Sequence, residues 1–333
     1  MNMNKWIEDI INSPVKKPFP VLTFPSVGFM NMTVEELVSS SDNLANGIKI
    51  IADKVDMPAA LGYMDLSIEA EAFGANTVYS ANEVPNITGS IADTEEAAEA
   101  LKVPEVGAGR TGKSIEAIAK ARKLITDKPL IAGTIGPFSM AGRLMGVSNA
   151  MIFCYDEPDL CHILLRKSTD FLIKYILEFK KAGADAVLIA EPLAGILSPS
   201  LCQEFSTDYI KEIVEAVQDE DFILLYHNCG NEAVRLIDVI LDTGCKAYHF
   251  GDAIDMADMM PHIPADILAM GNLKPAYFRN STTEEIRQET LNLLEKCGKY
   301  PNFLISSGCD VPPTAKWENV EAFFDAAAEF YSK

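Results

Sequence analysis

The stretch Phe222-Ile-Leu-Leu-Tyr-His-Asn-Cys229 decides how the chain folds. Its five leading apolar residues are typical of a parallel strand that is buried on both faces. Similar short apolar runs recur along the chain, and an amphipathic stretch separates each run from the next. The predicted strands are residues 19–24, 57–63, 129–135, 186–190, 222–226, 247–250, 267–270 and 303–305.

Helical periodicity fills the segments between these strands. Thr33 and Glu36 have the spacing of a capping box, and Asp156 is a plausible N-cap with Pro158 in the first turn behind it. The predicted helices are residues 33–52, 114–124, 156–181, 200–217, 232–241, 282–297 and 317–330.

Repeated strand–helix units imply right-handed crossovers between parallel strands. Eight predicted strands favour a closed (β/α)8 TIM barrel, an α/β fold, over an open sheet. We expect one barrel domain spanning residues 1–333. Residues 1–18 would be an N-terminal extension. Residues 64–113, rich in proline and glycine, would be an insertion after the second strand that caps the barrel mouth.

Composition excludes several function classes. The chain has 333 residues, 48% of them hydrophobic, and 28 basic against 48 acidic residues give a net charge of −20. Such a surface lacks the basic footprint of a nucleic-acid-binding protein and repels anionic membranes. The seven cysteines are irregularly spaced and the N-terminus has no apolar signal core, so we expect a cytoplasmic protein without disulfides. No apolar run reaches the roughly 18 residues of a membrane span.

Polar residues follow several of the predicted strands. In a (β/α)8 barrel the carboxyl ends of the strands carry the catalytic groups, so these residues are expected at one mouth. Glu191 and Asp252 are predicted to be catalytic, and Asn272 to contact a cofactor. The polar residues at strand ends are Glu191, His227, Cys229, Asp252, Asn272, Lys274, Cys309 and Asp310.

His227, Cys229 and Cys309 predict a metal site. His227 and Cys229 are two apart on an extended segment, so both can face the barrel axis, and Cys309 arrives from the last strand. One imidazole and two thiolates suit zinc and leave a fourth position free for chemistry. The alternative is two buried cysteines and a satisfied histidine without metal. Glu191 is either a fourth ligand or a nearby base, or it bonds a backbone amide or an arginine at the rim.

Two further groups have competing interpretations. Asp65 and Glu69, four residues apart after the second strand, either share a helix face near the mouth or form a solvated face. His249, between Tyr248 and Phe250, is expected to be a packed residue.

The motifs resemble those of the uroporphyrinogen decarboxylase superfamily, and within it those of the zinc-dependent methylcobamide:thiol methyltransferases, such as the coenzyme M methyltransferases of methanogens. The resemblance implies a (β/α)8 barrel with zinc on His227, Cys229 and Cys309. It is carried by residues 65–74, by residues 183–191, by Ser198-Pro199, by His227-x-Cys229, by Gly271-Asn272 and by Ser307-Gly-Cys-Asp310. The decarboxylase branch has arginines in the region of residues 23–30 and an aspartate where this chain has Lys274. Both are missing here, so porphyrinogen decarboxylation is not expected.

The resemblance implies the transfer of a methyl group between a corrinoid and a small thiol or another methyl donor or acceptor. Zinc would convert the thiol into a thiolate, which attacks the methyl group of methylcobalamin. The corrinoid would ride on a separate partner protein, because the chain has no D-x-H-x-x-G cobalamin motif. The setting would be methanogenesis or methylotrophy. The direction of transfer, the small molecule and the oligomeric state stay open. The alternatives are a uroporphyrinogen decarboxylase-like lyase and an inactive barrel that only binds.

Overall fold

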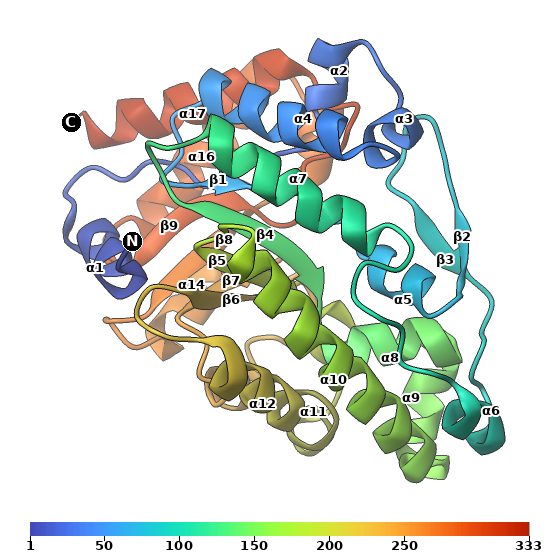
Figure 1. Ribbon diagram of the computed structural model, residues 1–333. Helices are drawn as coiled ribbons and strands as arrows, with labels where there is room; N and C mark the ends of the chain where they lie inside the picture. The colour runs from blue at the N-terminus through green and yellow to red at the C-terminus, as the bar shows by residue number, and fades with distance from the viewer. Residues whose placement is uncertain (333) are drawn as a thin grey trace.

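Seven parallel strands form one curled sheet at the centre of the molecule (Figure 1). The structure is a computed structural model and describes residues 1–332. Each strand pairs with the next along the chain, as βα crossovers require. In sheet order the strands are β1 (Ala60–Leu61), β4 (Leu130–Ile135), β5 (Ala186–Ala190), β6 (Ile223–Asn228), β7 (Ala247–Phe250), β8 (Leu268–Leu273) and β9 (Phe303–Ser307).

The first predicted strand, residues 19–24, is not a regular strand. It still lies between the two edges of the sheet: the Phe19 N–H donates to the Ile305 carbonyl at 2.9 Å, and the Thr23 hydroxyl donates to the Leu61 carbonyl at 3.3 Å. Pro20 lies inside the segment and has no N–H to give to a ladder. The prediction of eight regular strands is therefore corrected to seven strands and an irregular segment, in a TIM-barrel-like fold.

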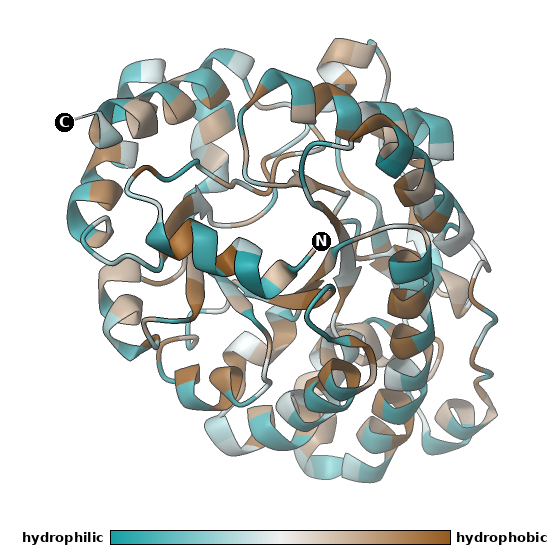
Figure 2. Cartoon of the chain, turned by 60° about the vertical axis from the view of Figure 1, so that its left-hand side comes forward, coloured by the Kyte–Doolittle hydropathy of each residue, from teal (hydrophilic) through white to brown (hydrophobic). Residues whose placement is uncertain are grey.

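Helices surround the sheet and turn polar residues outward, while the strands inside are mostly hydrophobic (Figure 2). Core side chains from both layers are buried, as expected for parallel strands covered by helices. The helices are α1 (Met3–Asn12), α2 (Ser26–Met30), α3 (Val34–Val38), α4 (Ser41–Lys54), α5 (Ile68–Ala72), α6 (Glu95–Ala100), α7 (Thr111–Leu124), α8 (Pro137–Met145), α9 (Val147–Asp156), α10 (Pro158–Lys181), α11 (Pro199–Cys202), α12 (Asp208–Val217), α13 (Ile237–Leu241), α14 (Met256–Met259), α15 (Pro275–Asn280), α16 (Thr283–Cys297) and α17 (Trp317–Tyr331).

Several predicted helices differ in their boundaries. The capping box of Thr33 and Glu36 is present, but the predicted helix 33–52 is two helices, because Ser40 caps a new start at α4. Asp156 ends α9 instead of capping α10. The predicted helix 200–217 is helical throughout, with a π-helical stretch at Gln203–Thr207 between α11 and α12. The predicted helix 232–241 shortens to α13. Helix α8, which begins at Pro137, was not predicted.

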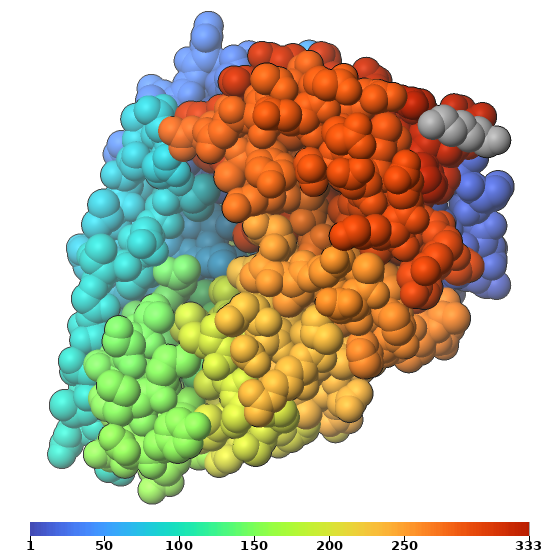
Figure 3. Space-filling view, turned by 180° about the vertical axis from the view of Figure 1, so that it is seen from behind, coloured from blue at the N-terminus to red at the C-terminus, as the bar shows by residue number. Residues whose placement is uncertain are grey.

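The segment 64–113 contains α5, α6 and a hairpin of β2 (Asn76–Val78) and β3 (Asn86–Thr88). The hairpin region is tied to helices that follow β4 and β8. Arg143 of α8 donates to the Asn86 side chain at 3.0 Å, and Arg279 of α15 pairs with Glu83 at 3.5 Å. A recess separates this segment (cyan) from the orange part of the chain in Figure 3. The role of the segment as a cap stays a prediction.

Residues 1–18, the predicted N-terminal extension, contain α1, which lies across one end of the sheet in Figure 2. Met3 and Ile7 are buried, and the Met3 N–H donates to the Glu220 carbonyl at 2.7 Å. Among residues 1–332, no helix is both long and apolar enough to cross a bilayer.

Candidate metal centre

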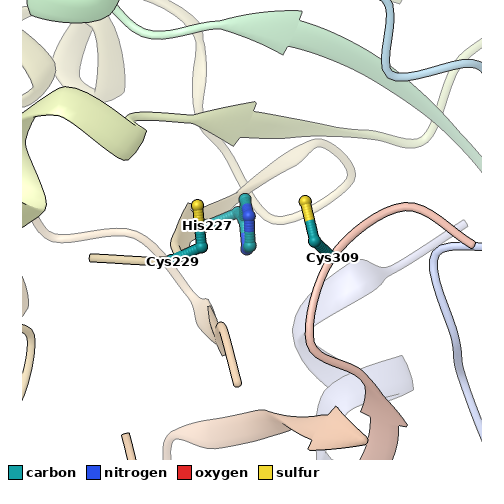
Figure 4. A group of neighbouring side chains, drawn as sticks. All are labelled: His227, Cys229 and Cys309. Carbon is teal, nitrogen blue, oxygen red and sulfur yellow. The ribbon is translucent and has the colours of Figure 1, made fainter. Parts of the chain in front are cut away.

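The structure brings His227, Cys229 and Cys309 together at the carboxyl end of the sheet (Figure 4). His227 lies near the end of β6, Cys229 follows that strand directly, and Cys309 lies two residues beyond β9. One potential ligand atom from each residue lies within 4.8 Å of the other two. This spacing allows all three to bind one ion after small side-chain adjustments.

Two glycines make room for this convergence. A Cβ at position 251 would lie 2.4 Å from the Cβ of Cys229, closer than real Cβ contacts allow. A Cβ at position 308 would lie 2.6 Å from the backbone nitrogen of Asp252. Gly251 and Gly308 therefore let the loops after β7 and β9 pack closely around the two cysteines.

A chain of hydrogen bonds fixes the tautomer of His227. The Ser306 hydroxyl donates to the Phe19 carbonyl at 2.7 Å, so it accepts from Nε2–H of His249 at 2.8 Å. His249 Nδ1 then carries a lone pair and accepts from Nδ1–H of His227 at 2.7 Å. Burial lowers the pKa of His249, which agrees with a neutral ring. His227 consequently directs an unprotonated Nε2 away from the relay.

The Nε2 atom of His227 is buried and has no hydrogen-bond partner. A buried lone pair without a partner is costly, and metal-bound histidines usually donate their other ring nitrogen to a neighbour, as His227 does. With two thiols beside it, this donor set fits a zinc ion with three protein ligands.

The two thiols interact with each other. A hydrogen bond with Cys309 lowers the pKa of Cys229, and the same interaction, with burial, raises the pKa of Cys309 to about 12. One thiol of such a pair gives up its proton more readily than the other. A divalent cation would favour the thiolate form of both.

A small cavity of about 50 Å³ adjoins the three residues. Its walls are mostly apolar. Apart from His227, Cys229 and Cys309, Asp310 is the polar residue that lines it. Oδ1 of Asp310 is buried and has no hydrogen-bond partner, and burial raises the pKa of this carboxyl. The apolar lining residues are Val21, Met64, Leu66, Leu188, Ala190 and Pro192.

Glu191 lies outside the group of ligand atoms. Its carboxylate accepts from the backbone N–H groups of Phe138 at 3.1 Å and Ser139 at 2.5 Å, at the start of α8. Gly136 permits this approach, since a Cβ there would meet the carboxylate. Burial raises the pKa of Glu191 to about 7. The arrangement matches the alternative in which Glu191 bonds backbone amides.

Asp252 and Asn272 lie beside the centre, on the loop after β7 and in β8. Asp252 is exposed and faces Gly308. The Asn272 amide donates to the carbonyls of Gly251 at 2.9 Å and Ile254 at 2.8 Å, so it holds the loop after β7. Both residues line a more open, polar pocket. Their predicted catalytic and cofactor-binding roles stay predictions.

Asp65 and Glu69 are buried instead of forming a solvated face. Arg110 forms a buried ion pair with Asp65 and a second pair with Glu71 at 2.6 Å. Glu69 accepts from the Thr134 hydroxyl at 2.6 Å, and burial raises its pKa to about 7.

Sequence reasoning missed the participation of His249 and Asp310 in the centre. His249 is buried as expected, but it also orients His227. The signal was available in strand pairing, because β6 and β7 place His227 directly opposite His249. Asp310 was placed at the mouth, but nothing in the sequence indicates that one of its oxygens lacks a partner.

The curled parallel sheet and the centre at its carboxyl edge define an α/β enzyme scaffold. The chain belongs to the uroporphyrinogen decarboxylase (URO-D) family, whose model matches residues 28–330. It is 29% identical over 294 residues to a uroporphyrinogen decarboxylase of Psychromonas ingrahamii, covering 83% of this chain and 80% of the relative. It is 26% identical over 289 residues to that of Pseudoalteromonas translucida, with 83% and 80% covered.

Solved structures have the same fold. A methyltransferase from Methanosarcina mazei superposes with a TM-score of 0.85 at 22% identity, covering 99% of this chain and 98% of its own. A B12-independent methionine synthase from a Shewanella species gives a TM-score of 0.54 at 12% identity, covering 96% and 94%. At these identities the likeness establishes the fold.

Proposed function

We propose that this protein is a zinc-dependent methyltransferase that moves a methyl group between a corrinoid and a small thiol. The observation that carries the proposal is the buried, partnerless Nε2 of His227 beside the thiols of Cys229 and Cys309, at the wall of a cavity. Bound zinc would lower the pKa of a thiol that coordinates it. A structural neighbour with nearly the same length is named a methyltransferase, which supports this class of reaction.

The protein's own residues would prepare the thiol for attack. Ser306 and His249 hold His227 in the ligating tautomer. The apolar cavity walls exclude water from the sulfur and so keep it nucleophilic. In the transfer, the sulfur forms a bond to the methyl carbon and the cobalt–carbon bond breaks. Both electrons of that bond stay on cobalt, and the thiol proton passes to solvent when the thiol binds.

The corrinoid would be presented by a separate carrier protein at the mouth of the barrel. The cavity volume of about 50 Å³ has room for only a few heavy atoms, which suits a small thiol and not a corrinoid ring. The reverse transfer, from a methylated small molecule to reduced cobalt, would use the same groups.

A uroporphyrinogen decarboxylase-like lyase is the second candidate, because curated relatives such as that of Psychromonas ingrahamii have this name. A substrate with several carboxylates requires cationic partners. No lysine or arginine lines the cavity among residues 1–332, whereas Asp310 does. This charge pattern favours the methyltransferase.

Elemental analysis and a demethylation assay test the proposal together. We expect about one zinc per chain and thiol-dependent loss of the methylcobalamin spectrum. Zinc-free protein that decarboxylates uroporphyrinogen would establish the second candidate instead.

A further inference from the structure

The walls of the cavity beside the ligand group are hydrocarbon side chains held on a fixed backbone. Val21 lies on the irregular segment between the two sheet edges, where its N–H donates to the Ser307 hydroxyl at 2.9 Å. Leu188 lies in the middle of β5, which pairs with β4 on one side and β6 on the other. Met64 lies against Gly133, where a Cβ would collide with the Met64 sulfur. The shape of the cavity is therefore set before a ligand enters.

Within residues 1–332, these walls offer no cationic side chain that would hold an anion. Sulfonates and carboxylates bind in proteins through lysine, arginine or unpaired N–H groups, and burying them without such partners is costly. The N–H of Val21 is already bonded to Ser307. Asp310 lines the cavity, but a carboxyl carries no positive charge in either protonation state. Because the sulfur of the thiol would take the open position on the metal, an acidic substituent would be buried without a cationic partner.

The cavity is also too small for a bulky substituent. A volume of about 50 Å³ corresponds to about three to five water-sized positions, since one water occupies about 10–15 Å³ of such space. The sulfur at the metal takes part of this room. The remainder accepts a short hydrocarbon chain, whose burial against Met64, Leu66 and Leu188 is favourable.

We propose that the substrate thiol is a short, uncharged alkyl thiol, such as ethanethiol, and that thiols with a sulfonate or carboxylate group are rejected. This inference rests on the proposed function and specifies its substrate class. The sulfur loses its proton to solvent and gains the methyl group, while cobalt keeps both electrons of the broken bond. The product is an alkyl methyl thioether, which is also uncharged and fits the same apolar walls.

Binding of matched thiols to Co²⁺-substituted protein tests the inference without turnover, through changes in the ligand-field bands of cobalt. The probes are ethanethiol, 2-mercaptoethanesulfonate and a bulky neutral thiol in which a tert-butyl group replaces the sulfonate. We expect ethanethiol to bind at least about tenfold more tightly than the bulky neutral thiol, because the tert-butyl group exceeds the space. The sulfonate should bind most weakly, since it meets the same steric limit and is also buried without a cation.

Leu188→Ala separates size from charge. The shorter side chain enlarges the cavity, so the bulky neutral thiol should gain about tenfold in affinity while the sulfonate gains less than about twofold. Ile189→Ala is the matched control and should change neither affinity, because Ile189 is buried in the same strand and points to the opposite face of the sheet.

Val21→Ala opens another wall by less and should give a smaller gain of the same kind, which keeps the test decisive where Leu188→Ala does not fold. Comparing each thiol between wild type and variant cancels the differences in thiol acidity. The metal content and the cobalt spectrum of each variant before thiol is added show that its site is intact.

A sulfonate that binds as tightly as ethanethiol, or that gains as much as the bulky neutral thiol in Leu188→Ala, would overturn the inference. So would a bulky neutral thiol that gains equally in Ile189→Ala. Methylcobalamin demethylation is measured separately. Demethylation with 2-mercaptoethanesulfonate and not with ethanethiol would overturn the inference and leave the proposed function standing. Selective ethanethiol binding without methyl transfer would refute the proposed function and support the apolar thiol site.

Discussion

Two sets of polar residues occupy the same end of the sheet, and they differ in how their atoms are satisfied. Glu191, Asp65 and Arg110 are buried with partners supplied by the protein itself. His227 ends in a buried nitrogen without a partner, and Asp310 in such an oxygen. Polar atoms that fold without partners beside a cavity indicate a missing ligand. The first set stabilises the barrel end, and the second is available for chemistry.

Cys309→Ala should have the largest effect, and it acts on the candidate metal centre. Removing one of three ligands leaves an imidazole and one thiolate, which do not hold zinc firmly. We expect zinc content to fall from about one per chain to a small fraction, with loss of methyl transfer and a preserved circular dichroism spectrum. The control is Cys245→Ala, a buried cysteine outside the ligand group, which should keep its zinc. Collapse of the fold in Cys309→Ala alone would mean that the metal is structural.

Arg110→Ala tests the set of buried residues whose polar atoms have partners within the protein. The variant leaves Asp65, whose side chain is 1% exposed, as a buried charge without its partner. Breaking such a pair typically costs about 3–5 kcal/mol of unfolding free energy. Arg166→Ala is the control, since that side chain is 43% exposed and pairs at the surface with Glu212, which is worth at most about 1 kcal/mol. Urea denaturation measures both, and zinc bound at saturating metal should be unchanged. Equal losses in the two variants would contradict the burial argument.

Glu191→Gln tests whether Glu191 is a structural carboxylate or a metal ligand. The test compares how the free energy of unfolding depends on pH in the wild type and in the variant. Burial raises the pKa of Glu191 from 4.5 to about 7. The stabilisation from a raised folded-state pKa is complete below pH about 4.5 and is lost as pH rises through about 7. As pH rises across this window, the free energy of unfolding of the wild type should therefore fall by on the order of 3 kcal/mol relative to that of the variant.

Urea denaturation of metal-free protein at several pH values measures that difference. Zinc content of the loaded variant should equal that of the wild type, because Glu191 lies outside the ligand group. Loss of zinc from Glu191→Gln would instead place this carboxylate on the metal.

Ser306→Ala should have the smallest effect, because it changes only the hydrogen bonds that orient His227. Without the hydroxyl, His249 no longer has a fixed tautomer to accept from His227. Removing such an outer partner typically lowers metal affinity by about 10- to 100-fold. Competition with a zinc chelator measures the affinity. An unchanged affinity would show that the relay does not hold His227. The control is Ser332→Ala, which changes an exposed serine outside the relay.

The sequence predicted the elements whose residues specify them locally. Continuous apolar runs located the seven strands, and Thr33 with Glu36 located a helix start. Residues 19–24 were misread because the apolar run was weighted above Pro20, whose missing N–H already argues against a regular ladder. Helix α8 begins at Pro137 after Gly136. It was missed because the carboxylate that accepts from its first N–H groups, those of Phe138 and Ser139, belongs to the distant Glu191 and reaches them only in the folded barrel.

The ligand group could be predicted from its residue types and its place at strand ends. The relay from Ser306 to His227 depends on strand register, and the partnerless Asp310 depends on what the other elements leave unpaired. Both are properties of the assembled barrel, so single-sequence patterns do not contain them.

The zinc X-ray absorption spectrum of the loaded protein tests the central claim most directly. A centre built from His227, Cys229 and Cys309 should show two sulfur ligands and one imidazole nitrogen, at about 2.3 and 2.0–2.1 Å, and a third sulfur after a thiol is added. A spectrum of oxygen and nitrogen ligands only, or one that Cys309→Ala leaves unchanged, would contradict the account.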